Sequence, residues 1–431
     1  MKTRGRWRLS LMMALLYAVQ GSFWPLLGVH LGELGVQGRA RGWIFASQAL
    51  AAVALPLGAG QLVDRLMPTQ WFLALAYAIG GLILAALASG WVASPLALFL
   101  VFLAYWSFIA PTNGLSSSLA MRNLDAPGRE YGAVRLWGTI GWMAVGWLVS
   151  AVMLANPTRP TAGMHEAFAI AAALSLVMAV YSAFLPHTPP LATAATGGAN
   201  LWQGLEVLRQ SDVRVYLITA FGVALTTPLV YQAMPGYLAA RGLPRPWIST
   251  AMTLGQVPEV AALAALPWLL GRFGCKWTIA AGITAWLVRF ATLAVNPPLW
   301  LAVGGGVLHG VGYGCFTIGG QVFLDGRAPR THRASVQAIV LVLTTGLGSL
   351  LGSLLAGEWV GRGRPGDDVL VFLIPCMING ALLIYFLRGF ESHVSTVERD
   401  GAANAEGSPR PFSVRGTVAR VGNLVTESAD G

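Results

Sequence analysis

The chain has 431 residues, of which 55% are hydrophobic and only 11% are charged. Soluble globular proteins carry about twice that share of charged residues, so the composition excludes a soluble domain and indicates an integral membrane protein. The net charge is +10, but the basic residues are scattered over many short segments, which argues against a nucleic-acid-binding face. Three cysteines without CxxC spacing indicate neither a disulfide framework nor a metal site, and we expect no cofactor.

The first half of the chain contains about six apolar stretches long enough to cross a bilayer. The first stretch, residues 9–31, follows a basic N-terminus. It is too long for the core of a signal peptide and lacks a small-residue cleavage site, so we interpret it as a transmembrane helix. The other five lie near residues 43–63, 71–89, 95–120, 132–154 and 165–185.

A change of composition then divides the chain. Residues 186–200 are rich in Pro, Gly, Ala and Thr with almost no charge, which is typical of a flexible connector. Six more spans follow, near residues 213–240, 247–270, 277–295, 298–324, 334–357 and 369–388. The predicted domains are an N-terminal bundle (1–186), a cytoplasmic linker (187–212), a C-terminal bundle (213–390) and a disordered cytoplasmic tail (391–431).

The distribution of Lys and Arg predicts the orientation. With a cytoplasmic N-terminus, roughly nineteen of these residues fall on the cytoplasmic side and about seven outside, so both termini are expected to be cytoplasmic. Six plus six spans with a polar connector is the arrangement of transporters that bind their substrate between two parallel repeats. We therefore predict an all-α multi-pass protein of the inner membrane, with about twelve transmembrane helices in two six-helix bundles, working as a monomer in the lipid bilayer.

The end of the second predicted span reads GAGQLVDRL, with Gly60, Asp64 and Arg65 in G-x-x-x-D-R order. This pattern resembles the loop signature of the major facilitator superfamily. The resemblance implies that Gly60 allows close helix approach, while Asp64 pairs with Arg65 or a facing helix end and holds the inward gate. From the residues alone, a turn with a solvated ion pair is the alternative. The corresponding loop of the second half, LLGRFGCKW, has no acid.

The fifth span opens with YGAVRLWGTIGW, in which Arg135, Thr139 and Trp142 recur at four and three residues. This spacing places them on one helix face, which is polar and aromatic. Such a face is suited to a binding site. The alternative for Arg135 is a side chain that extends along the helix to the lipid headgroups.

The eighth span contains Glu259, the only carboxylate of the sequence well inside an apolar span. Glu259 lies about 18 Å along the helix from Trp247, near the middle of a hydrocarbon layer of roughly 30 Å. An ionised carboxylate there is costly, so it must pair, face a polar cavity or hold a proton. Gln256 shares its helix face. The alternative is a structural Glu that caps a neighbouring helix.

The tenth span, LHGVGYGCFTIGGQVF, carries His309 and Tyr313 four residues apart on one face. They either contact the substrate or bond to each other between packed helices. Arg289 in the ninth span is interpreted as structural or interfacial. Other polar intramembrane groups are less specific, namely Gln20 and Trp24 in the first span, Tyr105, Thr112 and Asn113 in the fourth, and Tyr231 and Gln232 in the seventh.

VRLWGTIGW, together with GQVPE in the eighth span and RASVQ at the start of the eleventh, resembles the nucleoside:proton symporter branch of the superfamily. The resemblance implies that Arg135, Thr139, Gln256 and Glu259 contact the nucleoside. Trp142 takes the place of an aromatic residue beside the substrate, where an indole can stack on a nucleobase. The family's prototypes carry an acid in the tenth span, and here the aligned residue is Gly314. Proton coupling therefore rests on Glu259, with or without His309, or is lost.

These observations predict a secondary active transporter that imports nucleosides by proton symport with alternating access. The alternatives are a symporter for sugars or small aromatic acids, because the VRLWG stretch also occurs in such permeases, and a non-coupled facilitator. An enzyme is not expected, since the membrane region has neither paired carboxylates nor a nucleophile with its base. The sequence contains no G-x-x-x-x-G-K-[ST] phosphate-binding loop, which excludes a pump of the P-loop type.

Overall fold

A computed structural model describes residues 2–54, 67–156, 162–189, 206–329, 332–360 and 367–391, and among these residues every regular element is a helix and none is a strand. Ten helical segments in this part are long and apolar enough to span a membrane. About twelve spans were predicted, and one of the ten segments holds the eighth and ninth of them. The second predicted span, 43–63, is described only as far as the end of α3 (Gly38–Ala54), and its other residues lie outside the described part of the chain. The predicted all-α membrane fold is confirmed.

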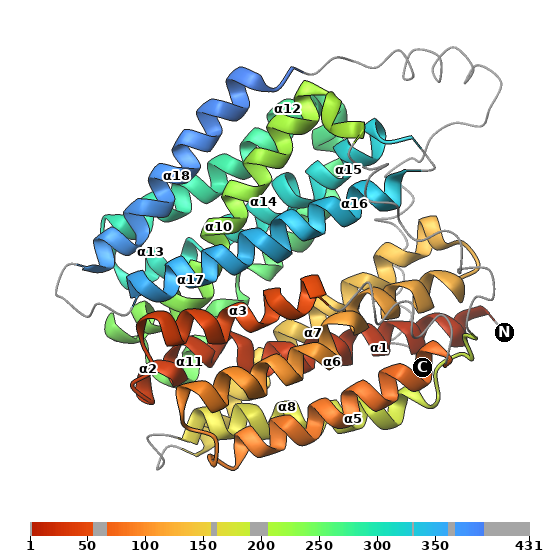
Figure 1. The fold of residues 1–431 in the computed structure, drawn as a ribbon, viewed down its shortest axis with the longest axis vertical. Helices are drawn as coiled ribbons and strands as arrows, with labels where there is room; N and C mark the ends of the chain where they lie inside the picture. Colours follow the sequence, from red (N-terminus) through yellow and green to blue (C-terminus); the bar gives the residue numbers. More distant parts are fainter. Residues whose placement is uncertain are drawn as a thin grey trace, which may run out of the picture. The chain divides into compact units, whose positions relative to one another are not determined.

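The N-terminal half begins with α1 (Lys2–Phe23), which continues through a short 3₁₀ turn at Trp24–Leu26 into α2 (Leu27–Glu33). Pro25 accounts for this change of helix type, because proline provides no backbone N–H to the helical ladder. The remaining helices of this half are α3, α5 (Thr69–Ala88), α6 (Pro95–Arg122), α7 (Pro127–Ala155) and α8 (Ala162–Ser182). Within the half, α1 packs against α7 and α5 against α8 (Figure 1).

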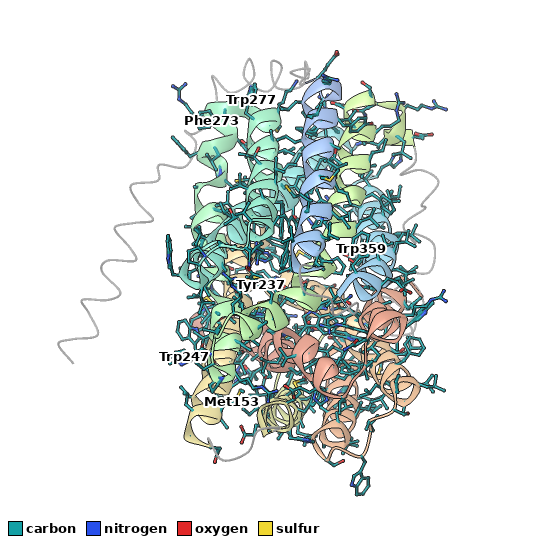
Figure 2. All side chains as sticks on the ribbon, turned by 90° about the vertical axis from the view of Figure 1, so that its left-hand side faces the viewer. Met153, Tyr237, Trp247, Phe273, Trp277 and Trp359 are labelled. Carbon is teal, nitrogen blue, oxygen red and sulfur yellow. The ribbon has the colours of Figure 1, made fainter. Side chains whose placement is uncertain are left out.

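The C-terminal half contains α10 (Ser211–Ala240), α11 (Arg245–Thr253) and the long α12 (Gln256–Ala294). Gly274 lies inside α12 with a φ of 74°, a conformation that favours glycine, and it marks the turn between the eighth and ninth predicted spans. Exposed aromatic side chains flank the eighth span, with Trp247 at its start and Phe273 and Trp277 at its far end (Figure 2). Aromatic rings are enriched at the two membrane–water interfaces, so this placement fits a membrane-crossing helix.

The tenth and eleventh spans are irregular. The tenth runs through α13 (Leu299–Gly304), α14 (Val307–Gly312), a π-helical segment at Tyr313–Ile318 and α15 (Gly319–Arg327). The eleventh runs through α16 (Arg333–Leu341), a π-helical segment at Val342–Gly348 and α17 (Ser349–Val360), and α18 (Asp367–Gly389) follows. The π-helical segments are rich in glycine or flanked by it, and glycine holds the regular α-helix poorly.

Buried apolar side chains form two cores. One is built from residues 9–185 with Ile248, and the other from residues 207–390. Two cores fit the predicted pair of bundles, although the boundaries of the four predicted domains stay a prediction. The two halves meet where α3 packs on α17, α2 on α10 and α11 on α7, and this contact leaves room for a cavity deeper between them.

Candidate functional site

A cavity of about 680 Å³ lies between the two halves. Small-molecule sites typically measure about 300–1,000 Å³, so the cavity has the size of a binding site. All seven residues that were predicted to bind substrate line it. They are Arg135, Thr139 and Trp142 on α7, Gln256 and Glu259 on α12, His309 on α14, and Tyr313 in the π-helical segment of the tenth span.

The wall from the N-terminal half centres on Arg135. Its guanidinium carbon lies 4.0 Å from the centre of the Tyr17 ring, which is a cation–π contact between α7 and α1. Both residues line the cavity, so the guanidinium lies in it rather than at the headgroups. Tyr17 was not predicted, because a tyrosine in an apolar span is indistinguishable by sequence from a packing residue.

The facing wall begins with Gln256 and Glu259 in the first turn of α12. A break at Leu254 and Gly255 separates α11 from α12, and Pro258 favours a helix start because it needs no N–H partner. Glu259 therefore lies in the first turn of α12, next to Pro258, and its side chain lines the cavity.

Arg135 lies near enough to Glu259 for their charges to interact, although no direct ion pair joins them among the described residues. Tyr17, Tyr231 and Tyr313 also line the cavity and interact with the charge of Glu259. One cation from the N-terminal half, one carboxylate from the C-terminal half and three hydroxyls therefore surround the space. This set can donate and accept hydrogen bonds and can change its net charge by one proton.

Close helix approach positions His309. A side chain at Gly310 would place its Cβ 2.6 Å from the carbonyl oxygen of Gly255, so only glycine lets α14 pack this tightly on α12. The imidazole of His309 meets the indole of Trp286 edge to face, with ring centres 5.1 Å apart. Trp286 also lines the cavity and was not among the predicted site residues.

The structure adds further polar lining residues that the sequence did not single out. Gln337 donates a hydrogen bond of 2.8 Å from Nε2 to Asp325 Oδ1, which joins α16 to α15. Of the less specific polar groups, Tyr231 lines the cavity, whereas the other six are not among the described lining residues. The added polar residues are Thr227, Thr317, Gln321, Gln337, Thr344, Thr345 and Ser349.

Gly314, the residue that we expected at the position of a tenth-span acid, is buried and is not among the described residues that line the cavity. A Cβ at this position would lie 2.8 Å from the Cβ of Ala262 on α12. A carboxylate would therefore need α12 to shift. The predicted gating residues Gly60, Asp64 and Arg65 lie outside the described residues.

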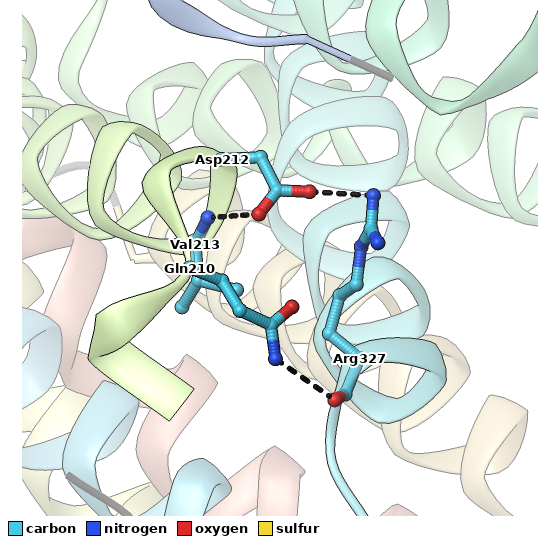
Figure 3. Close-up of polar contacts among 4 residues, drawn as sticks. All are labelled: Gln210, Asp212, Val213 and Arg327. Carbon is cyan, nitrogen blue, oxygen red and sulfur yellow. Dashed lines mark hydrogen bonds and ion pairs between the residues drawn. The ribbon is translucent and has the colours of Figure 1, made fainter. Parts of the chain in front are cut away.

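The end of the C-terminal half near the start of α10 is held by polar contacts (Figure 3). Arg327 on α15 pairs with the buried Asp212 at 2.5 Å, and Asp212 also accepts a hydrogen bond from the backbone N–H of Val213. The Gln210 side chain donates to the Arg327 carbonyl at 3.5 Å. These contacts tie the start of α10 to the end of α15 within the C-terminal half.

The two halves are joined at the opposite end of these helices. Arg245 at the start of α11 pairs with Glu33 at the end of α2, and Arg39 pairs with Glu358 at 3.4 Å. The buried Arg41 donates to the carbonyl of Gln232 on α10. The Gln232 side chain in turn donates to the Ser353 carbonyl on α17. The two ion pairs and the Arg41 hydrogen bond join the two halves at this end of the cavity, whereas the Gln232–Ser353 bond holds α10 to α17 within the C-terminal half.

Comparison with known proteins identifies similar chains. A family model described as nucleoside H+ symporter matches residues 1–393. The nucleoside permease NupG of Escherichia coli is 27% identical, with 82% of this chain and 87% of NupG covered. A maltose permease of Geobacillus stearothermophilus is also 27% identical, with 86% and 92% covered. The crystal structure of the nucleoside transporter NupG superimposes with a TM-score of 0.78 at 25% identity, covering 90% of this chain and 99% of that structure.

Proposed function

Because the chain belongs to the nucleoside H+ symporter family, we propose that it imports nucleosides together with protons by alternating access between its two halves. The observation that carries this proposal is the convergence of Arg135, Thr139, Trp142, Gln256, Glu259, His309 and Tyr313 on one cavity. These residues come from both halves, so a substrate bound among them contacts both halves. The chain is a multi-pass membrane transporter and not an enzyme.

The chemistry of the cavity suits a nucleoside. Glu259 accepts hydrogen bonds from ribose hydroxyls or base amines, whereas Arg135 and Gln256 donate to carbonyl and ring-nitrogen acceptors of the base. The indole of Trp142 offers a face for stacking. An anionic aromatic acid would meet the Glu259 carboxylate, which disfavours that alternative substrate.

Glu259 is the proposed proton carrier. When the carboxylate is protonated, its attraction to Arg135 across the cavity is lost, and the balance between the two orientations of the halves changes. Coupling requires such a difference, because a proton can bias a conformational equilibrium only by interacting differently with its two states. His309 assists as a substrate contact, and Gly314 takes no part.

The proposal includes an orientation. The protein acts as a monomer in the inner membrane, with both termini in the cytoplasm. The end closed by Arg245 and Glu33 then faces outward, and the cavity is reached from the cytoplasm past Gln321 and Gln337. In the outward-open state Gly60, Asp64 and Arg65 would form the inward gate.

Uptake of a radiolabelled nucleoside panel into proteoliposomes tests the proposed function. With an inward proton gradient, nucleosides should accumulate above their external concentration, and collapse of the gradient by an uncoupler should abolish the accumulation. Maltose and small aromatic acids serve as competitors, because one similar protein is a maltose permease. Accumulation of maltose without any nucleoside uptake would contradict the proposal, and equilibration that ignores the gradient would identify a facilitator.

A further inference from the structure

Arg289 on α12 is a buried cation that the substrate cavity does not use. Its residue is only 5% exposed, and it is absent from the lining of the 680 Å³ cavity. Within the described part of the chain its Nε and Nη1 atoms have no hydrogen-bond partner. A buried guanidinium with unmet donors is costly, so its position needs an explanation.

A second, small cavity of about 20 Å³ adjoins Arg289. It is lined by Arg289, by Tyr231, and by Gln256 and His309, which also line the substrate cavity. A buried water needs about 10–15 Å³ measured in this way, so the small cavity accommodates one water and no organic ligand. This small cavity therefore lies between Arg289 and the side chains of Gln256 and His309, which belong to the substrate site.

Two of the residues that line this space each carry a buried polar atom without a partner. The Gln256 Oε1 and His309 Nδ1 atoms are buried and have no partner among the described residues. One water can accept a hydrogen bond from Arg289 and donate to both of these atoms, which gives it three of the two to four partners that a buried water requires.

The surrounding rings hold the three side chains in place. The Arg289 guanidinium carbon lies 5.7 Å from the centre of the Trp286 ring, and Trp286 packs edge to face on His309. Trp286 therefore contacts both Arg289 and His309 and links the ninth span to the tenth. Gln256 approaches these residues from the start of α12.

We propose that Arg289 is a positioning residue, which acts through one bound water to hold Gln256 and His309 with their N–H groups toward the substrate cavity. With Nδ1 accepting from the water, the neutral imidazole carries its proton on Nε2. With Oε1 accepting, the Gln256 amide turns its NH₂ group away from Arg289. Gln256 and His309 then present N–H donors to the cavity beside the acceptor Glu259. The site therefore selects substrates that carry a hydrogen-bond acceptor next to a hydrogen-bond donor.

The network exists without substrate, so its first test uses the ligand-free protein. The chain has six histidines, and ¹⁵N-histidine NMR of the full-length protein in lipid reports the tautomer of each. The signal that His309→Gln removes is assigned to His309. We expect a single Nε2–H tautomer with a hydrogen-bonded Nδ1 in the wild type, retention of this tautomer in Arg289→Lys, and its loss in Arg289→Met. An Nδ1–H tautomer in the wild type, or an unchanged His309 signal in Arg289→Met, overturns the inference.

The second test concerns selectivity and rests on the proposed function. Arg289→Met should raise the KM for nucleosides about tenfold with little change in maximal rate, since one oriented set of donors is lost. In a protein that already carries His309→Phe and Gln256→Ala, Arg289→Met should not raise the KM further. The reason is that the effects of substitutions are not additive when the residues act through each other. Arg289→Met combined with Arg135→Lys should be additive. If the wild type transports no nucleoside, the proposed function fails while the NMR result still decides the role of Arg289. Equal effects of Arg289→Met in both backgrounds contradict the inference.

Discussion

The two walls of the cavity are built differently. The N-terminal wall consists of α1 and α7, where no proline or π-helical segment interrupts the cavity-lining turns, and behind it a cluster of rings packs tightly, with Phe23 and Tyr105 centred 5.6 Å apart. The C-terminal wall combines the continuous α10 with interrupted helices, namely the junction of α11 and α12 before Gln256 and the π-helical segments at 313–318 and 342–348. From this comparison we infer that the N-terminal wall keeps its shape, whereas the C-terminal wall can change it. We refer to them below as the fixed wall and the adjustable wall.

The physical reason lies in the backbone. A regular helix satisfies its own polar groups and offers only side chains to a cavity, whereas a broken helix also offers its terminal N–H and C=O groups. Such breaks are tolerated at membrane depth where they line a cavity. The fixed wall therefore supplies the cation Arg135 on its Tyr17 support, and the adjustable wall supplies the carboxylate at a helix start. The predictions below test this division, starting with the largest expected effect.

The adjustable wall should carry the proton. Glu259→Gln keeps the shape of the side chain but removes its titratable group, so concentrative uptake should fall to the level of protein-free liposomes while counterflow exchange survives. Wild-type uptake should fall with a single midpoint as the external pH rises, because fewer carriers are protonated outside, and the variant should lose this dependence. Radiolabelled uptake at several external pH values measures both effects.

His309→Gln is the matched control on the same wall, because it keeps a polar side chain without a proton site in the working range. It should retain the pH dependence of uptake. If this variant loses the dependence while Glu259→Gln keeps it, proton coupling belongs to the tenth span. Uphill transport by Glu259→Gln would contradict the role of Glu259 outright.

The fixed wall should determine affinity rather than coupling. Arg135→Lys keeps the charge but loses the planar fork that can meet two acceptors, so the KM for nucleosides should rise about tenfold at unchanged gradient dependence. Arg122→Lys, an exposed arginine on the neighbouring α6, is the control and should transport normally. An unchanged KM in Arg135→Lys would place the guanidinium outside the substrate site.

The elements of both walls could be predicted from the sequence to different degrees. The spans of the fixed wall follow from apolar length alone, and they agree with α1 and α7. The π-helical segments could not be predicted, because Gly-rich stretches such as YGCFTI are compatible with an ordinary helix until packing against α12 is known. The seven residues predicted to bind substrate line one cavity, and each was singled out as a polar or aromatic side chain that shares a helix face with another such residue.

The sequence was less informative where a residue acts through another. Tyr17 supports Arg135 by its ring, and Trp286 packs on His309, but aromatic residues are common in apolar spans and carry no signal of their own. Arg289 was interpreted as structural or interfacial from the position of its span. Its place behind Gln256 and His309 depends on the crossing of α12 and α14, which only the three-dimensional arrangement provides.

Tyr17 should have a smaller effect than Arg135, because it supports the charge without holding it. Tyr17→Phe keeps a ring under the guanidinium, whereas Tyr17→Leu removes it, and a cation–π contact contributes about 0.5–2 kcal/mol depending on exposure. The KM should therefore rise about threefold to tenfold in Tyr17→Leu and less in Tyr17→Phe. Kinetics of uptake for the two variants side by side give the answer, and a larger loss in Tyr17→Phe would indicate that the hydroxyl itself binds substrate.

The smallest effect is expected where the two walls meet, at the ion pair between Arg245 and Glu33. Both side chains are partly exposed, at 43% and 23%, and such a pair is worth about 0–1 kcal/mol. Glu33→Gln should therefore change the equilibrium between the inward-open and outward-open states by less than about fivefold. The coupling proton should still be carried by Glu259. Accessibility of a single cysteine introduced into the closed end, measured by the rate of its labelling, reports this equilibrium.

The charge-reversed pair Glu33→Arg with Arg245→Glu is the control and should restore the wild-type labelling rate. The effect of Glu33→Gln should decrease at high salt, because exposed charges are screened. A tenfold change in the labelling rate that is insensitive to salt would mean that this contact holds the closed end by packing rather than by charge. The closed end would then be more stable than its ion pairs alone can explain.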